Sequence, residues 1–192
     1  MVWVEEIEPY YRCIVIAALT GLLLQMIIKK LLGQAQRKYI VFMAVGIAVV
    51  YLARFGPTWK AYGSILTGML LLYAAVYDYE THLVPDYVHI IILLAGVVSR
   101  HPVPGLIGML LVPFPLFIAV LLKENSIGGA DIKLMGACSY LLGLRLGYAA
   151  LLMGLSLAIL VRNVRHKPQN EPFALVPYLT VGCIVMMLGG HT

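Results

Sequence analysis

Eight continuously apolar runs, separated by short charged or proline-containing breaks, dominate this chain of 192 residues. Because lipid offers no hydrogen-bonding partner to a bare peptide group, such runs are typical of helices that satisfy their own backbone. They lack the alternation of polar and apolar residues that marks a strand of a membrane barrel. The runs are residues 13–28, 39–53, 61–77, 87–98, 105–122, 132–144, 146–161 and 174–188. The sequence therefore predicts an all-α, polytopic membrane bundle of about eight transmembrane helices.

The composition excludes a water-soluble globule. Hydrophobic residues make up 61% of the chain and charged residues 12%, against about 45–50% and about 25% in ordinary soluble domains. One core of this size cannot hide so much apolar surface from water, so the remainder must face lipid. The longest polar connections are 29–38 and 162–172, which leaves no room for a soluble domain. We expect a single integral membrane domain, with two N-terminal helices in residues 1–60 and a six-helix core in residues 61–192.

The placement of the basic residues predicts the orientation. With the N-terminus outside, nine Lys and Arg residues fall on the cytoplasmic side and five outside, as the positive-inside rule requires. If residues 132–161 formed one helix interrupted at Arg145, the basic residues Arg162, Arg165 and Lys167 would lie outside, so we expect two short helices there. The net charge of +5 therefore indicates membrane topology, and no nucleic-acid partner is expected.

Two acidic residues directly adjoin apolar runs on the predicted cytoplasmic side. Asp78 follows the third run, in the segment 77–86, and Asp131 precedes the sixth, in the segment 128–134. A carboxylate at a membrane boundary is costly unless it is paired or hydrated, so both are candidate functional residues. Capping explains Asp78 poorly, because a negative charge at a helix C-terminus opposes the helix dipole.

Two neighbouring carboxyls cannot easily both ionise, so such a pair shares one proton. The ionised member can take a proton from water as the water attacks a peptide carbonyl. The protonated member can hydrogen-bond the carbonyl oxygen and later protonate the leaving amine. This chemistry needs no metal and no cofactor.

The residues around the two acids suggest supporting roles. Gly128 and Gly129 would let a substrate strand or a second carboxylate come close. Lys133, about 200° around a helix from Asp131, would reach the interface or another acidic group. Pro85 favours a turn-bearing loop over residues 78–86.

Simpler interpretations remain for several of these polar residues. Asp86 is expected to cap the fourth run rather than to act in catalysis, and Asp131 fits capping and catalysis equally well. Glu80 fits a solvated loop charge. His82 lies near enough to tune a carboxyl, whereas His89 and His101 are expected on helix surfaces or in loops. Cys13, Cys138 and Cys183 stand singly in apolar runs and are expected in the core.

At these two segments the sequence resembles the type IV prepilin peptidase family of membrane aspartic proteases. That family has an Asp at a helix end followed, eight positions later, by the Asp of a Leu/Ile-Pro-Asp turn, as Asp78 precedes Val84-Pro85-Asp86 here. Its second motif, Gly-x-Gly-Asp-x-Lys-Leu, resembles residues 128–134, with Ala130 at the second glycine. A weaker match is the Pro-Phe segment before the last helix, seen at 172–173 and 176–179 with two extra residues, Leu175 and Val176. The resemblance extends from about residue 61 to the end.

The resemblance implies that Asp78 and Asp131 are the catalytic pair of a leader peptidase in the bacterial cytoplasmic membrane. Its substrate would be a type IV prepilin or pseudopilin, cut after its short basic leader at the cytoplasmic face. The expected supporting residues are Gly128, Gly129, Lys133, Pro85, Asp86 and Glu80. The loop 78–86 carries three carboxylates and no Lys or Arg, so it would attract a basic leader.

The connection 29–38 is too short for the cysteine-bearing cytoplasmic domain of the larger relatives that also methylate the product. We therefore expect peptidase activity without N-methylation.

Two other function classes stay open. A proton-coupled transporter could use Asp78 and Asp131 as a proton relay, although transporter sites usually lie near the bilayer midplane within broken helices. A catalytically idle assembly partner is a third possibility.

Overall fold

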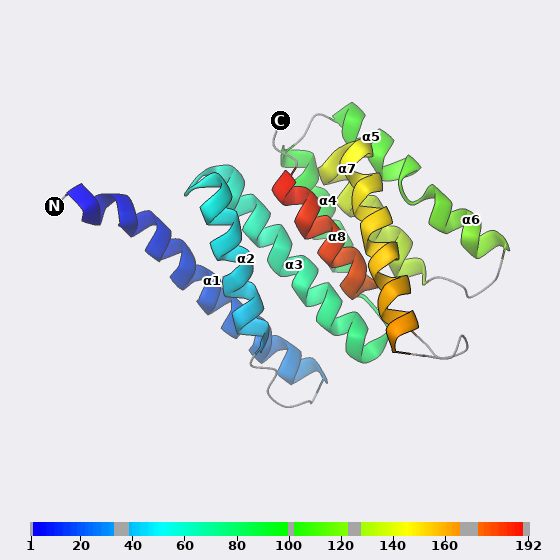
Figure 1. Cartoon of the computed structure of the whole chain (residues 1–192), viewed down its shortest axis with the longest axis horizontal. Coiled ribbons are helices and arrows are strands. Elements are labelled where there is room, and N and C mark those ends of the chain that lie inside the picture. Colours follow the sequence, from blue (N-terminus) through cyan, green and yellow to red (C-terminus); the bar gives the residue numbers. More distant parts are fainter. Residues whose placement is uncertain (1, 33–38, 100–101, 123–127, 166–172, 190–192) are drawn as a thin grey trace. The chain divides into compact units, whose positions relative to one another are not determined.

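The computed structural model describes residues 2–32, 39–99, 102–122, 128–165 and 173–189, and every element in these ranges is an α-helix (Figure 1). This confirms the all-α prediction. The chain divides into two compact units, residues 1–73 and 74–192, and each is described by itself. The helices are α1 (Val2–Leu32), α2 (Tyr39–Phe55), α3 (Trp59–Thr81), α4 (Asp86–Ser99), α5 (Pro102–Leu111), α6 (Phe114–Leu122), α7 (Gly129–Val164) and α8 (Val176–Gly189).

The first unit contains α1, α2 and most of α3. Helix α1 begins at Val2, well before the apolar run at 13–28. Helix α2 buries Ile40, Ala44 and Ala48, spaced one turn apart on one face, as expected of a helix packed along one side. A side chain at Gly21 of α1 would lie 2.9 Å from the Ala44 Cβ atom, so these two helices approach closely.

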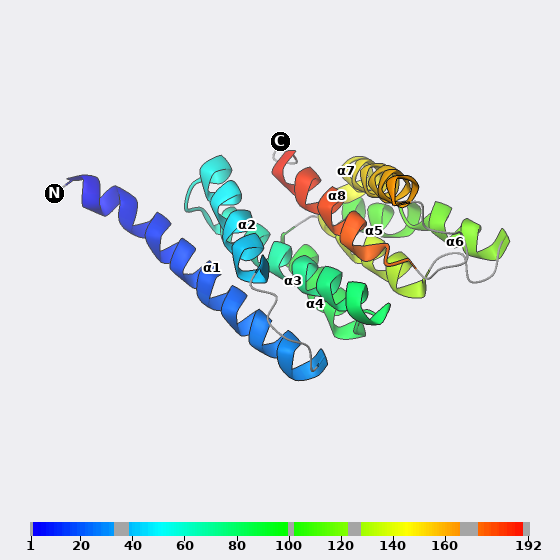
Figure 2. The same ribbon diagram turned by 60° about the horizontal axis from the view of Figure 1, so that its bottom comes forward.

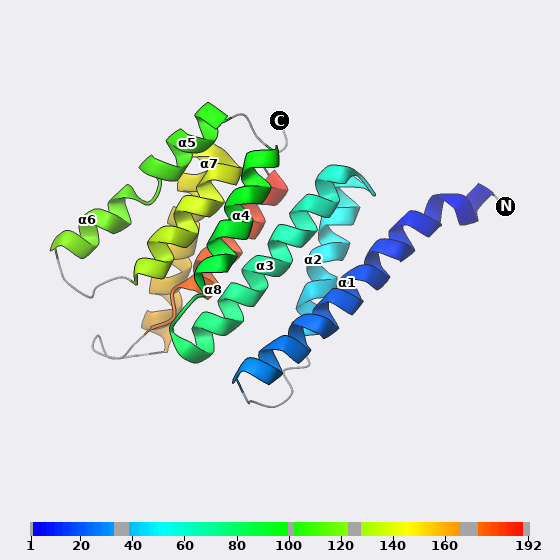
Figure 3. The same ribbon diagram turned by 180° about the vertical axis from the view of Figure 1, so that it is seen from behind.

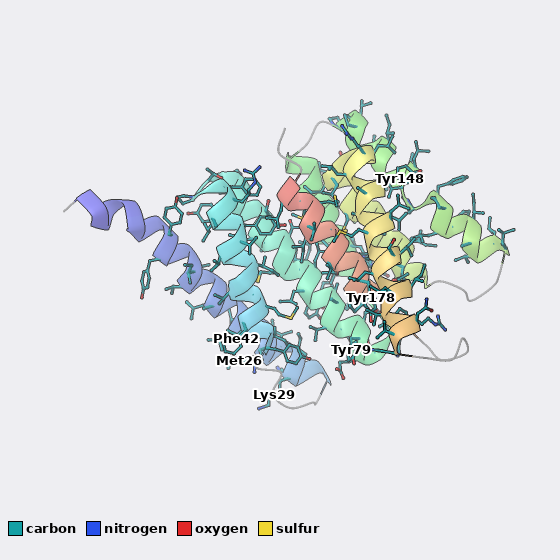
Figure 4. The ribbon with its side chains drawn as sticks, in the orientation of Figure 1. Met26, Lys29, Phe42, Tyr79, Tyr148 and Tyr178 are labelled. Carbon is teal, nitrogen blue, oxygen red and sulfur yellow. The ribbon has the colours of Figure 1, made fainter. Side chains whose placement is uncertain are left out.

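Large apolar side chains cover the outward faces of α1 and α2. Met26 and Phe42, labelled in Figure 4, are 66% and 77% exposed. Leu23 and Ile16 are exposed in the same way. So much outward apolar surface suits a lipid environment better than water.

In the second unit, α7 turns back on itself at Gly143. This residue has φ 78° and ψ 178°, a combination open almost only to glycine. A Cβ atom at Gly147 would lie 2.8 Å from the Ser139 Oγ atom, whereas eight residues of straight helix span about 12 Å. Figures 2 and 3 show the two arms, 129–142 and 144–164, as separate helices. The prediction of two helices is confirmed, with the break two residues before Arg145.

The run at 105–122 is predicted as one helix, and this is wrong at Pro113. The structure has α5 ending at Leu111 and α6 beginning at Phe114, because a proline lacks the N–H that an uninterrupted helix needs. A carbonyl at the end of a helix has no partner within it. The Tyr148 hydroxyl, labelled in Figure 4, donates to the Leu111 carbonyl at 2.7 Å, so the second arm of α7 satisfies the end of α5.

Two apolar segments, Pro102–Leu122 and Gly129–Val164, are long and apolar enough to cross a membrane. Helices α2, α4 and α8 contain shorter apolar stretches. Because Pro113 and Gly143 interrupt the two long segments, their lengths alone do not define the crossings. The predicted eight crossings, the outside N-terminus and the single membrane domain therefore stay predictions.

Helix α8 packs against both arms of α7. The Cys138 and Cys183 side chains hydrogen-bond each other, and each stands seven residues after Asp131 and Val176, respectively. The first arm of α7 therefore begins at the same end of the unit as helix α8. Both cysteines are buried, as predicted, while the side chain of Cys13 lies outside the described part.

The reversal at Gly143 gives a stability prediction. Gly143→Ala should lower the free energy of unfolding by about 1–3 kcal/mol, because alanine is strained at this φ and ψ. A thermal unfolding curve of the purified chain in detergent measures the loss.

Gly46→Ala is the matched control, since a Cβ atom there meets nothing within 4 Å and alanine is the better helix former by about 1 kcal/mol. If Gly143→Ala and wild type have the same unfolding midpoint, a side chain at position 143 does not strain the backbone of the reversal.

Candidate active site

Asp78 lies in the last turn of α3, in the part of this helix that belongs to the second unit. Its side chain is 6% exposed, and its Oδ2 atom accepts a hydrogen bond from the Val176 N–H at 3.2 Å. Val176 is the first residue of α8, and the first N–H groups of a helix have no partner within it. The positive end of the α8 dipole therefore faces the Asp78 carboxylate and stabilises its charge.

Asp131 lies in the first turn of α7 and is 7% exposed. The Gly128 N–H donates to Asp131 Oδ2 at 3.2 Å, and the Asp131 N–H donates to the Gly128 carbonyl at 3.1 Å. Asp131 thus takes part in capping from the third helical position, whereas its predicted place as the N-cap is wrong because Gly128 is the N-cap. This bond leaves the other carboxylate oxygen available for chemistry.

The two carboxyls are close enough that the charge of Asp78 acts on Asp131. Figures 1 and 3 show the end of α3 beside the beginnings of α7 and α8. The fold therefore brings together the two acids that the sequence singles out. Because a negative charge on one acid disfavours ionisation of the other, burial and the charge of Asp78 raise the pKa of Asp131.

Asp78 follows the apolar run at 61–77, and its titration reflects its surroundings. Burial raises the pKa of the Asp78 carboxyl to about 6, while the Val176 amide and the nearby His82 lower it. The carboxyl can therefore change its protonation state near neutral pH, which suits a group that accepts and returns a proton.

The segment predicted as a loop from 78 to 86 is shorter in the structure. Helix α3 continues to Thr81, and only residues 82–85 are non-helical. His82 ends the helix with a positive φ of 53°, and its N–H donates to the Asp78 carbonyl at 2.8 Å. Glu80 lies in the last helical turn with one carboxylate oxygen buried, so its interpretation as a solvated loop charge is wrong.

Lys133 binds Asp86, the first residue of α4. The Lys133 Nζ atom lies 2.7 Å from Asp86 Oδ1, and both side chains are exposed. This confirms that Lys133 reaches another acidic group. The hydrogen bond from Lys133 lowers the pKa of Asp86, so Asp86 is charged but its charge is already paired. Pro85 accepts a hydrogen bond from the Val88 N–H at 3.1 Å, which closes the turn into α4.

Two features of this region differ from, or go beyond, what the sequence predicts. The Val176 amide could not be assigned, because nothing in the sequence joins it to an acid 98 residues away; the Pro-Phe segment before the last helix was the only signal. His89 is buried, and neither of its ring nitrogens has a hydrogen-bond partner within the described ranges. Its expected place on a surface or in a loop is therefore wrong. His101 lies outside the described residues.

The two glycines before Asp131 differ in the room they provide. A Cβ atom at Gly128 would lie 3.1 Å from Asp131 Oδ2, whereas one at Gly129 would meet nothing within 4 Å. Gly128 thus makes space for the Asp131 carboxylate itself. Within the described part of the chain, no group of three or more His, Cys, Asp or Glu residues could hold a metal ion.

Comparison with protein families decides the family membership. The model of the type IV leader peptidase family matches residues 65–162, which include Asp78, Asp131 and the helices between them. The chain belongs to the type IV leader peptidase family. It is accordingly a peptidase of this kind, and the family implies a substrate of the prepilin type. Comparisons with curated proteins and with solved structures give no significant match.

The variant Gly128→Ala tests whether prepilin cleavage depends on the position of the Asp131 carboxylate. A methyl group there would push the Asp131 carboxylate from its position, and cleavage of a type IV prepilin should fall by about 10-fold to 100-fold, because small displacements of catalytic groups are costly. Initial rates with equal amounts of membrane protein measure this.

Gly129→Ala is the matched control and should keep a rate close to wild type. Equal cleavage rates for both variants would mean that cleavage does not depend on the space that Gly128 leaves for the Asp131 carboxylate.

Proposed function

We propose that this chain is a membrane-embedded aspartic endopeptidase that removes the basic leader from type IV prepilin-like precursors at the cytoplasmic face. Asp78 and Asp131 are the catalytic pair. The observation that carries the proposal is that two buried carboxyls, 53 residues apart in the sequence, interact electrostatically within the segment that matches the family. The leader peptidase chemistry predicted from the sequence requires such a pair.

The surroundings of the two acids suggest a division of work. Asp78 accepts a hydrogen bond from the Val176 N–H, and His82 also stabilises its charged form. Asp78 is therefore the ionised member, which takes the proton from the attacking water. Asp131, in the field of the Asp78 charge, keeps the shared proton. It hydrogen-bonds the carbonyl oxygen and then protonates the leaving amine. The pair works by acid–base catalysis through its own oxygens.

The acidic residues near the site suit a basic leader, but one of them, Asp86, is already paired. Asp86 is engaged by Lys133, so it does not act as an unpaired attractant. A Lys or Arg of the leader can take the place of Lys133 on Asp86, because the ion pair is exposed to solvent and exposed pairs are weak. Leader binding then exchanges one ion pair for another.

The proposed setting is the bacterial cytoplasmic membrane, crossed about eight times with the N-terminus outside. The positive-inside distribution supports this orientation and places both acids at the cytoplasmic side. We also propose that the enzyme lacks N-methyltransferase activity, since the connection 29–38 has no room for a further domain.

Asp78→Asn and Asp131→Asn should each reduce cleavage of a co-expressed type IV prepilin by at least about 100-fold, because each removes one partner of the proton exchange. Electrophoresis of the precursor and product, normalised to the amount of peptidase in the membrane, measures the effect. The same product, analysed by mass spectrometry, should carry an unmethylated N-terminus.

Glu8→Gln, an acidic residue of α1 in the first unit, is the control and should cleave normally. Normal cleavage by either Asn variant would show that Asp78 and Asp131 are not the catalytic pair, and a methylated product made by this chain alone would refute the proposed lack of methyltransferase activity.

The alternative, a proton-coupled transporter, would use the same two acids as a relay. Its site would be expected at a broken helix near the membrane centre. The break in α7 is at Gly143, about 18 Å along the helix from Asp131. The acids lie instead at helix ends, which favours the peptidase. Proton flux driven by a substrate in proteoliposomes, lost in both Asn variants, would favour the transporter.

A further inference from the structure

A stack of three side chains joins the end of α7 to the beginning of α8. The rings of Phe173 and Tyr178 are nearly parallel, with an interplanar angle of 6° and centroids 5.2 Å apart. The guanidinium carbon of Arg162 lies 5.6 Å from the Phe173 ring centroid, within the range of a cation–π interaction. Arg162 belongs to the last turn of α7. Tyr178, labelled in Figure 4, belongs to the first turn of α8.

The residue that contacts Asp78 lies between two members of this stack in the sequence. Val176 stands between Phe173 and Tyr178 in the sequence, is fully buried, and donates its N–H to Asp78. Pro177 has no N–H to offer. The N–H groups of Tyr178 and Leu179 donate to the Leu175 carbonyl. Of these first amides of α8, the one at Val176 is therefore the one directed at the carboxylate.

Close packing holds the rest of α8 against the second arm of α7. A Cβ atom at Gly154 would lie 2.9 Å from the Leu179 Cα atom, so the two backbones nearly touch there. This contact restrains the body of α8, while the direction of its first turn depends on the side chains around it. The ring of Phe173 is the described group that ties this turn to Arg162.

We propose that Arg162, Phe173 and Tyr178 are positioning residues, which hold the first amide of α8 on Asp78 and thereby keep this carboxyl in its charged form. The proposal rests on the proposed role of Asp78 in the peptidase. None of the three side chains needs to touch the substrate. Each acts through the Val176 N–H.

The charge of Asp78 depends on its burial and on two polar groups in the described part of the chain. Burial opposes its ionisation, whereas the Val176 amide on α8 and His82 at the end of α3 favour it. The charge of Asp78 in turn raises the pKa of Asp131 on α7. If the amide moves away, only His82 remains on the favourable side. The pKa of Asp78 must then rise, and the acidic limb of the pH–rate profile moves with it.

The test compares Phe173→Leu, which removes the ring, with Phe173→Tyr, which keeps it. A second pair is Arg162→Met, which removes the positive charge, and Arg162→Lys, which keeps it. With a purified type IV prepilin as substrate, we expect the acidic limb of the pH–rate profile to shift up by about 1 pH unit in Phe173→Leu. The rate then falls up to about 10-fold at the acidic end, with KM unchanged. Arg162→Met should show a smaller shift, and the two conservative variants should follow wild type.

A second readout is independent of cleavage. Infrared titration of the Asp78 carboxyl in the full chain, assigned by its loss in Asp78→Asn, should show the same upward shift in Phe173→Leu and Arg162→Met. A shift in this titration without prepilin cleavage by wild type would overturn the proposed function and keep the positioning role. Unchanged midpoints in both variants, with the unfolding temperature preserved, would overturn the positioning role and leave the peptidase standing.

Discussion

The candidate site depends on the hydrogen bond between the first amide of α8 and the carboxylate of Asp78. A buried carboxylate is costly without a partner, and a helix N-terminus supplies one that carries a partial positive charge and needs no basic side chain. The bond joins the end of α3 to the beginning of α8, while the field of Asp78 reaches Asp131 at the beginning of α7. Three helix ends are therefore organised around two acids.

The reversal of α7 makes this arrangement possible. Because the chain turns back at Gly143, the first arm of α7 carries Asp131 and the second arm carries Arg162 back toward the same end, where α8 begins. Seven residues further along the first arm and α8, the Cys138 and Cys183 side chains hydrogen-bond each other. A straight helix of this length would have placed Arg162 far from Phe173 and left the first turn of α8 without its stacking partner.

The sequence was sufficient for the helical class, the two acids and the break near Arg145, because apolar runs, flanking charges and short motifs are local properties. It was insufficient where a partner comes from a distant segment. The Val176 amide carries no side-chain signal, and the burial of His89 depends on which face of α4 meets α7. Pro113 is a local signal that the run at 105–122 does not stay one helix. Because a helix places Lys133 away from Asp131, the sequence could predict that Lys133 pairs with another acidic residue. It could not predict that this residue is Asp86.

The central claim is that Asp78 and Asp131 share one proton. An infrared titration of both carboxyls in the full-length chain, each band assigned by the corresponding Asn variant, tests it most directly. If the two carboxyls share a proton, wild type shows two separate titration steps, and after either substitution the remaining carboxyl titrates at a pH that matches neither step. Carboxyls that titrate independently, each at the same pH whether or not the other is present, would contradict it.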